Sequence, residues 1–280
     1  MSSYLLHSKG LAALARYVAP DTLLAFDLDG TLATIVDDFS AAKVTEPVQA
    51  TLQGLVKLVK ITLITGRSRK DALAILGFEP HLVIGNHGAE WPGDSDTRNQ
   101  HFVQCCTAWR DQLYDQLKGI QGVEIEFKGE SLTIHYRKAI DQDNAFALID
   151  AAIEKLAPRP KRIGGKFVVN LLPMEALSKG EALVAAMDRF GLKRAIYFGD
   201  DITDEEVFKL KCVDVLGVHI GKDNQTTAAY YLNRQSELLG LLNSMVLMLE
   251  LMAKKRSSSI AIPCCCDRTK YGVRCQSLCE

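Results

Sequence analysis

The chain has 280 residues, enough for one large domain or for a core domain with a smaller one beside it. A hydrophobic content of 48% and a charged content of 24% are typical of globular proteins, and a formal net charge of −1 excludes the basic surface that nucleic-acid binding requires. The first ten residues contain no apolar run as long as that of a signal peptide, so we expect a cytoplasmic protein without a transmembrane segment.

Short apolar runs recur along the chain, and helical patterns separate several of them. Such runs are typical of the buried strands of a parallel sheet, and they occupy residues 22–26, 61–65, 82–86, 195–199 and 213–220. The segment that Pro47 opens and the segment 179–190 have apolar residues at helical spacing. This alternation predicts an α/β fold with a doubly wound parallel-sheet, Rossmann-like core.

The middle of the chain has a different pattern. Residues 123–127 and 132–136 alternate apolar and polar side chains around a turn at 128–131, which predicts a β-hairpin with one buried face. A helical pattern follows at 143–156, and a further strand pattern follows at 167–171. We therefore expect an inserted smaller α+β cap domain at residues 104–173. The discontinuous core would then consist of residues 1–103 and 174–254.

The most apolar stretch runs from Leu238 to Met252. It is shorter than the roughly 20 residues that a bilayer span needs, and it contains Glu250. We expect a helix that packs on the core, and the alternative is a helix that lies on a membrane surface.

The chain has eight cysteines, which fall into two groups. Cys105, Cys106 and Cys212 lie in sequence of globular character, and we expect them to be buried thiols. The other five lie near the end of the chain, within residues 255–280, without the paired CxxC spacing of a zinc site. We expect this polar Cys-rich tail to be disordered, and an acylated or metal-binding tail is the alternative.

Four sets of polar residues follow apolar strands or open a helix. In open α/β sheets ligands bind at the edge where strands have their carboxyl ends. The four sets are residues 27–31, 65–67, Lys179 and 199–204. Carboxylates can cap helices or form salt bridges, but so many strand-end charges would repel one another without a cation. We interpret the sets together as a site for phosphoryl transfer.

The predicted chemistry begins with a carboxylate that attacks phosphorus. Asp27 is the predicted nucleophile, and Asp29 is the general acid and then the general base. Thr65 is expected to donate a hydrogen bond to the phosphate, and Lys179 is expected to offer a positive charge to the phosphate and to Asp27.

The same carboxylates predict a Mg²⁺ site, because Mg²⁺ prefers oxygen ligands. Asp27 and Asp200 supply carboxylates, and Asp29 supplies its backbone carbonyl. Asp201 and Asp204 are expected to orient these ligands from behind.

Several motifs resemble those of known phosphatases. FDLDGTL, ITGR, SKG and GDDITDEE resemble the haloacid-dehalogenase-like superfamily, and IGNHGAE, EFKGESLTIHYR and GGKFVVN resemble the trehalose-6-phosphate phosphatase family. The resemblance covers roughly residues 20–225. It implies an Asp nucleophile, Mg²⁺, a mobile cap and a set of substrate contacts. These contacts would be Arg67, Asn86, His87, Glu90, Glu126, Lys128, Lys166 and Asn170.

Two positions depart from the family pattern. The family usually has Glu where this chain has Asn170, and an acidic residue where it has Phe127. The roles of His135 and Arg137 stay open between substrate contact and a solvated hairpin face.

The predicted function is hydrolysis of trehalose 6-phosphate to trehalose and phosphate through an aspartyl-phosphate. One alternative is a phosphatase for glucosylglycerol phosphate or a glycosyl-phosphoglycerate, and another is a non-catalytic regulator that binds a sugar phosphate. We expect a monomer, and any association with a trehalose-phosphate synthase would be with a separate chain.

Overall fold

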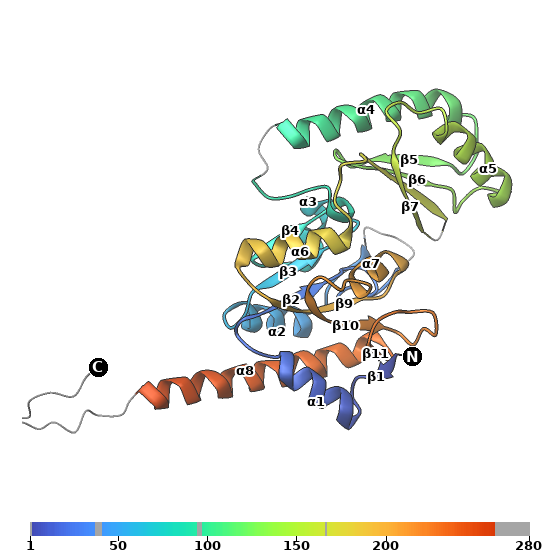
Figure 1. Ribbon diagram of the computed structural model, residues 1–280. Coiled ribbons are helices and arrows are strands. Elements are labelled where there is room, and N and C mark those ends of the chain that lie inside the picture. The colour runs from blue at the N-terminus through green and yellow to red at the C-terminus, as the bar shows by residue number, and fades with distance from the viewer. Residues whose placement is uncertain (1, 37–40, 94–96, 166, 261–280) are drawn as a thin grey trace, which may run out of the picture.

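A seven-stranded parallel sheet forms the centre of the larger domain (Figure 1). The computed structural model describes residues 2–36, 41–93, 97–165 and 167–260. The strand order is β1-β11-β10-β9-β2-β3-β4. These strands are β1 (Ser3–Tyr4), β2 (Thr22–Phe26), β3 (Ile61–Ile64), β4 (Leu82–Ile84), β9 (Arg194–Gly199), β10 (Asp214–Ile220) and β11 (Tyr230–Leu232).

Helices cover both faces of this sheet, so the predicted doubly wound α/β core is confirmed. One face packs against α1 (Ser8–Tyr17), α2 (Glu46–Val56), α3 (Arg69–Leu76) and α8 (Leu238–Ile260). The other face packs against α6 (Lys179–Phe190) and α7 (Glu205–Phe208). Short 3-10 turns lie at η2 (Asn86–Gly88), η3 (Ile202–Asp204) and η4 (Gln235–Glu237). Apolar residues on both sides of the strands explain their near-continuous apolar sequence.

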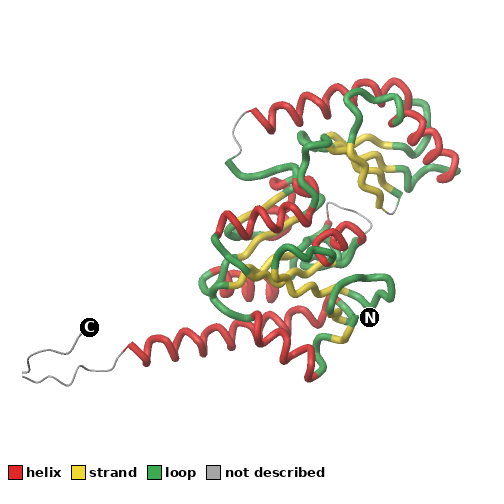
Figure 2. Tube along the Cα trace, in the orientation of Figure 1, coloured by secondary structure: helices red, strands yellow, loops and turns green. Residues whose placement is uncertain are grey.

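A four-stranded antiparallel sheet forms the cap, above the core in Figure 1. Its strand order is β5-β6-β8-β7, with β5 (Glu124–Phe127), β6 (Leu132–His135), β7 (Lys161–Gly165) and β8 (Val168–Leu172). Helices α4 (Thr97–Leu117) and α5 (Gln142–Ile153) cover one face, as the tube in Figure 2 also shows. The predicted hairpin is present. Strand β7 was missed because Gly164 and Gly165 interrupt any alternation.

The cap begins earlier in the chain than residue 104. Helix α4 starts at Thr97, and its side chains Cys106, Trp109 and Leu113 are buried against the cap sheet. The helix is continuous, so its first turn goes with the cap rather than with the core.

The two faces of the cap sheet have opposite character. Leu132 and Ile134 pack on the helices, whereas Thr133 and His135 alternate with them and lie on the other face. Thr133 pairs with Glu126 of β5 on one side and with Asn170 of β8 on the other. A polar row therefore crosses the face that the cap turns toward the core.

Helix α8 packs on the core, as predicted. It runs from Leu238 to Ile260 and is therefore longer than the apolar stretch that ends at Met252. Among the side chains that the structure describes, those of Leu238, Leu241, Leu242, Met245 and Leu249 are buried. Within the described residues, the segment Gln235–Lys255 is the one helix long and apolar enough to cross a membrane. The helix continues to Ile260, so residues 255–260 are helical rather than part of a disordered tail.

The cysteines divide differently from the prediction. Cys105 and Cys106 are buried in the cap, but Cys212 is exposed. Its position directly after Lys209–Lys211, between α7 and β10, places it in a surface connection. The tail cysteines lie outside the described residues.

Helix α8 allows a matched test of packing. Leu242→Ala removes a fully buried side chain and should lower the free energy of unfolding by about 2–5 kcal/mol. Leu247→Ala removes an exposed one on the same helix and should change it by less than about 0.5 kcal/mol. Urea denaturation measures both, and equal losses would contradict this packing.

Candidate functional site

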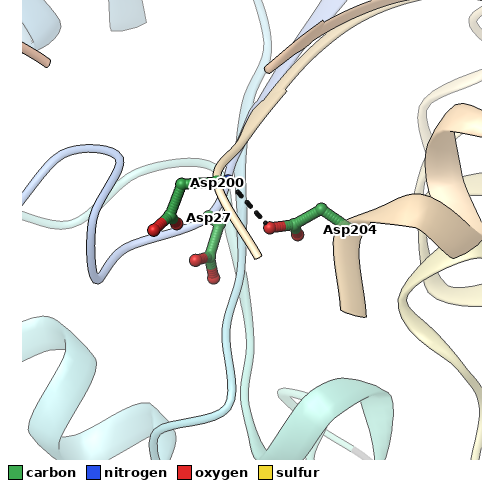
Figure 3. A group of neighbouring side chains, drawn as sticks. All are labelled: Asp27, Asp200 and Asp204. Atoms are coloured by element: carbon green, nitrogen blue, oxygen red, sulfur yellow. Dashed lines mark hydrogen bonds between the residues drawn. The ribbon is translucent and has the colours of Figure 1, made fainter. Parts of the chain in front are cut away.

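The site begins where two adjacent strands end. β2 pairs directly with β9, with Phe26 opposite Phe198, so Asp27 and Asp200 follow strands that end side by side. The Asp27 N–H donates to the carbonyl of Phe198 at 2.8 Å. Carboxylate oxygens of Asp27, Asp200 and Asp204 lie within 4.8 Å of one another (Figure 3). The structure thus brings together three of the predicted carboxylates.

Asp204 is fully buried, and four protein donors satisfy its carboxylate. Its Oδ1 accepts from Lys179 Nζ at 2.8 Å and from the Tyr197 hydroxyl at 2.6 Å. Its Oδ2 accepts from the backbone N–H groups of Asp200 and Asp201 at 3.0 Å each. Asp204 therefore shapes the loop and holds Lys179, and its role behind the metal ligands stays a prediction. The hydrogen bond from Tyr197 to Asp204 was not predicted, because Tyr197 lies in an apolar strand without a polar pattern.

Asp27 and Asp200 have fewer partners than Asp204. Asp27 Oδ1 lies 3.0 Å from Lys179 Nζ, and Asp200 Oδ1 accepts from the Thr31 hydroxyl at 3.3 Å. Gly30 has a φ of +80°, and a side chain there would collide with the Asp200 carboxylate. A glycine is thus required for the two strand-end loops to approach each other.

Positive charge is deficient at this cluster. Burial would lower the pKa of Lys179, but Asp204 and Asp27 outweigh that effect and raise it. Burial raises the pKa of Asp27 well above its usual range. Burial and then Asp204 raise the pKa of Asp200 to about 7. One ammonium is paired with the buried carboxylates of Asp27 and Asp204, and the half-buried carboxylate of Asp200 lies beside them. Asp27 and Asp200 therefore form an oxygen donor set that fits a divalent cation such as Mg²⁺.

Asp29 lies at the outer side of this cluster. Arg67 grips its carboxylate with two hydrogen bonds of 2.7 Å, one from Nε and one from Nη2. This fork geometry is the strong form of a carboxylate–guanidinium contact. The contact joins the loop after β2 to the loop after β3. Thr65, which is buried, lies in the second loop and accepts the Arg67 N–H through its hydroxyl at 3.2 Å.

The loop after β4 has an uncommon backbone. Asn86 and His87 are non-glycine residues with φ of +50° and +56°. Such residues cost about 1–3 kcal/mol each and persist where the surroundings hold them. Here the Asn86 N–H donates to the Arg67 carbonyl at 2.8 Å, and the His87 N–H donates to the Thr65 carbonyl at 2.9 Å. The loop is thereby bound to the loop after β3.

His87 and Glu90 take different positions in this loop. The His87 imidazole packs against Gly66, where any side chain would collide with it. Burial, then Lys179 and Lys128, hold the pKa of His87 well below its usual value, so the ring is neutral. Glu90 Oε2 instead accepts from the backbone N–H of Arg69 at 2.7 Å. His87 lies beside the site, whereas Glu90 braces the loop that carries it.

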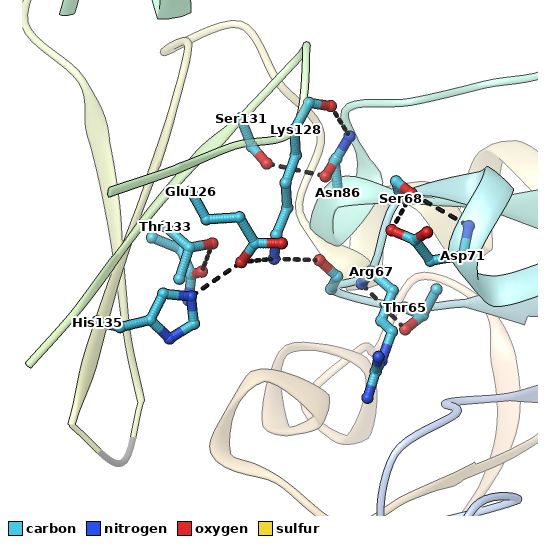
Figure 4. A network of polar contacts seen from close by, with 12 residues as sticks. Thr65, Arg67, Ser68, Asp71, Asn86, Glu126, Lys128, Ser131, Thr133 and His135 are labelled. Atoms are coloured by element: carbon cyan, nitrogen blue, oxygen red, sulfur yellow. Dashed lines mark hydrogen bonds and ion pairs between the residues drawn. The ribbon is translucent and has the colours of Figure 1, made fainter. Parts of the chain in front are cut away.

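The cap contributes charged side chains from its hairpin (Figure 4). Glu126 Oε2 lies 2.9 Å from His135 Nε2 and 3.5 Å from Lys128 Nζ. Lys128 Nζ in turn lies 3.5 Å from the Gly66 carbonyl. Burial raises the pKa of Glu126, but the His135 hydrogen bond and Lys128 bring it below its usual value. Cap and core charges therefore meet above the loop after β3, and His135 is a partner of Glu126 rather than a solvated side chain.

Two predicted substrate contacts are engaged within the protein. Asn170 is buried, and its amide accepts from the Thr133 hydroxyl at 2.7 Å and donates to the Ile163 carbonyl at 3.3 Å. The Asn86 side chain is fully buried and bonds to the cap hairpin. Both side chains therefore hold protein segments together in this structure, and their contact with a substrate stays a prediction. Lys166 lies outside the described residues.

Phe127 does not face the site. Its ring packs under the Arg110 guanidinium of α4, with 5.1 Å from Cζ to the ring centroid. Strand alternation places it on the face opposite Glu126. Its departure from the family pattern therefore leaves the polar face unchanged.

A groove of about 430 Å³ separates the tip of β7 from the core. Arg162, Ile163, Gly164 and Gly165 line it from the cap, and Asp201, Ile202, Thr203 and Glu206 line it from the core. Its lining includes Asp201, the residue that follows Asp200 in the chain. The sequence predicted a functional residue only on the core wall of this groove, at Asp201. The cap wall has two glycines, which carry no side-chain pattern.

Comparison with known proteins identifies relatives that match most of this chain. The family model described as trehalose-phosphatase matches residues 25–228. A rice (Oryza sativa subsp. japonica) protein named probable trehalose-phosphate phosphatase 4 is 28% identical over 257 residues, which are 86% of this chain and 69% of that protein. The trehalose-phosphate phosphatase of Mycobacterium ulcerans is 32% identical over 213 residues, 71% of this chain and 54% of that protein.

Solved structures share the fold. The C-terminal domain of C. albicans trehalose-6-phosphate phosphatase has a TM-score of 0.65 at 22% identity, and the match covers 88% of this chain and 98% of that one. A trehalose-6-phosphate phosphatase related protein has a TM-score of 0.68 at 19% identity, over 84% of this chain and 100% of that one. The Rossmann-like core with an antiparallel cap is thus the fold of these proteins.

Loss of the buried Lys179 should destabilise the protein far more than loss of the exposed Lys118. Lys179→Met leaves Asp27 and Asp204 buried without their cation and should lower the free energy of unfolding by about 3–5 kcal/mol. Lys118→Met removes an exposed pair with Asp115 and should have no measurable effect. Chemical denaturation in metal-free buffer compares them, and a stable Lys179→Met protein would refute the cluster energetics.

Proposed function

Because the chain belongs to the trehalose-phosphatase family, we propose that it hydrolyses trehalose 6-phosphate to trehalose and inorganic phosphate. The observation that carries this proposal is the meeting of Asp27 and Asp200, at adjacent strand ends, with Lys179 at the start of α6, beneath a cap with a charged face. A phosphate dianion needs cationic partners, and a sugar needs hydrogen-bonding side chains around it. The core loops offer the first and the cap offers the second.

In the proposed reaction, Asp27 attacks phosphorus, and Asp29 protonates the sugar oxygen that leaves. The products of this step are the free sugar and an acyl phosphate on Asp27 (the aspartyl-phosphate). Asp29 then takes a proton from water, the water oxygen attacks phosphorus, and the bond to Asp27 breaks to release phosphate. Both Asp29 oxygens accept hydrogen bonds from Arg67, so one of these two bonds has to open for Asp29 to carry the proton that it gives to the sugar oxygen. Thr65 and Lys179 bind phosphate oxygens.

We further propose that Mg²⁺ is the cofactor, held by Asp27, Asp200 and the backbone carbonyl of Asp29. The charge deficit of the cluster and its oxygen donors support this assignment. When bound, the cation neutralises charge that develops on the transferred phosphoryl group. Asp204 keeps its role behind the ligands, since its oxygens already have four protein donors.

The cap is proposed to select the sugar. Glu126 and Lys128 present a carboxylate and an ammonium beside Gly66, and His135 holds Glu126 in place. Asn170 distinguishes this cap from the family pattern, which keeps phosphatases of other glycosyl phosphates as the alternative. The presence of Asp27, Asp29, Lys179 and Asp200 together disfavours a non-catalytic regulator. The cytoplasmic location, the monomeric state and the association with a separate synthase stay predictions.

A substrate panel tests the proposed activity. Trehalose 6-phosphate should be hydrolysed with a higher kcat/KM than glucose 6-phosphate, glucosylglycerol phosphate or a glycosyl-phosphoglycerate, as measured by phosphate release. Asp27→Asn should lower kcat by about 10⁶-fold, as loss of the nucleophile does in a serine protease. Asp21→Asn, at an exposed pair with Arg194, is the matched control. Equal turnover of trehalose 6-phosphate and glucose 6-phosphate would rule out the proposed substrate.

Metal removal tests the cofactor through stability. Protein treated with EDTA and then given Mg²⁺ at 100 times its dissociation constant should gain about 2.7 kcal/mol, seen as a rise in Tm. Asp200→Asn should lose this gain, and Asp115→Asn, on the surface of α4, should keep it. A wild-type Tm that does not respond to Mg²⁺ would contradict the assignment.

A further inference from the structure

The turn of the cap hairpin and the loop after β4 share a buried polar residue. Asn86 is fully buried, although it lies in a loop where the backbone is left-handed. Its Oδ1 accepts from the Ser131 hydroxyl at 2.8 Å. Its Nδ2 lies 3.3 Å from the Lys128 carbonyl, 3.3 Å from Glu130 Oε2 and 3.2 Å from Glu90 Oε2. Three of these four partners belong to the cap, and Figure 4 shows the contacts with Lys128 and Ser131.

The hairpin turn is thereby bound at both ends. Within the turn, the Lys128 N–H donates to the Ser131 carbonyl at 3.0 Å. Asn86 binds the Lys128 carbonyl and the Ser131 hydroxyl, so the turn cannot shift along the core surface without breaking both contacts. Buried amide hydrogen bonds of this kind are expensive to leave unmade.

The same connection reaches the loop after β3. The Asn86 N–H donates to the Arg67 carbonyl at 2.8 Å, and Lys128 Nζ lies 3.5 Å from the carbonyl of Gly66. Asn86 therefore fixes the backbone of Lys128 relative to the loop that its own side chain contacts. The position of Glu126 depends on Lys128 in turn, because its carboxylate lies 3.5 Å from Lys128 Nζ.

We propose that Asn86 is a positioning residue, which clasps the cap turn to the core and thereby sets where Lys128 and Glu126 meet the sugar. The clasp is formed by Asn86, Ser131 and the Lys128 carbonyl. This inference rests on the proposed function for its substrate and deepens it, since the side chain acts through the cap residues and does not touch the ligand. Ser131 is the partner through which the role of Asn86 is tested.

The experiment compares Asn86→Gly, Ser131→Ala and the double variant. Glycine adopts the left-handed backbone without strain, so Asn86→Gly removes the side chain and keeps the conformation accessible, although it loosens the loop, and Ser131→Ala tests the same contact without a backbone change. Each single variant should raise KM for trehalose 6-phosphate about fivefold to tenfold, with kcat changed less than about twofold. The double variant should be no worse than Asn86→Gly. Hydrolysis of p-nitrophenyl phosphate, which lacks the sugar hydroxyls proposed to contact Lys128 and Glu126, should change less than about twofold.

The control is Ser244→Ala, which removes a hydroxyl bonded to the Gly240 carbonyl on α8, far along the chain from the cap. A rise in KM for Asn86→Gly without one for Ser131→Ala would overturn the proposal, because Asn86 would then contact the substrate itself. Equal losses on trehalose 6-phosphate and p-nitrophenyl phosphate would also overturn it, because the variants would then disturb the core.

Hydrogen exchange separates this inference from the proposed function. Backbone amides at residues 128–132 should exchange faster in Asn86→Gly and Ser131→Ala than in wild type, while those of α4 stay protected. Unchanged exchange at 128–132 would overturn the clasp whatever the enzyme hydrolyses. Wild-type protein without turnover of trehalose 6-phosphate would contradict the proposed function alone, and the exchange rates would still decide whether the clasp exists.

Discussion

The charge imbalance around Lys179 is the constraint on which the site depends. One buried ammonium lies 3.0 Å from Asp27 and 2.8 Å from Asp204, with Asp200 close to both. Lys179 is held in place because it is the first residue of helix α6, where the Ser178–Glu181 capping box fixes the first turn. The cluster also requires Gly30, which lets the Asp200 loop approach. A fold that buries such a cluster needs added positive charge, and this need links structural stability to the binding of a cation.

Strand alternation gives the cap sheet one apolar face and one polar face. Its apolar face closes on α4 and α5, and its polar face turns to the core. Charged side chains on that face are not independent, since Glu126 contacts both His135 and Lys128. The cap therefore presents a preassembled group, and the buried clasp at Asn86 places that group above the loop after β3.

The two departures from the family pattern have different consequences. Phe127 lies on the helix face against Arg110, so an apolar ring there satisfies packing and has no bearing on the polar face. Asn170 lies on the polar face, but its amide pairs with the Thr133 hydroxyl and the Ile163 carbonyl. A carboxylate cannot donate to a carbonyl, so asparagine suits this position in the sheet and removes one negative charge from the cap.

Sequence by itself determined the α/β core, the cap hairpin and the strand-end residues Asp27, Thr65 and Asp200, because apolar runs and alternation are local patterns with local causes. It did not locate β7, the full length of α8 or the exposure of Cys212, which depend on pairing and packing with distant segments. The tertiary structure alone decided that Asp204 is saturated by four donors and that Asn86 binds the cap. Hydrogen bonds between residues far apart in the chain, such as Asn86 and Ser131, leave no periodic signal, so only the folded chain shows them.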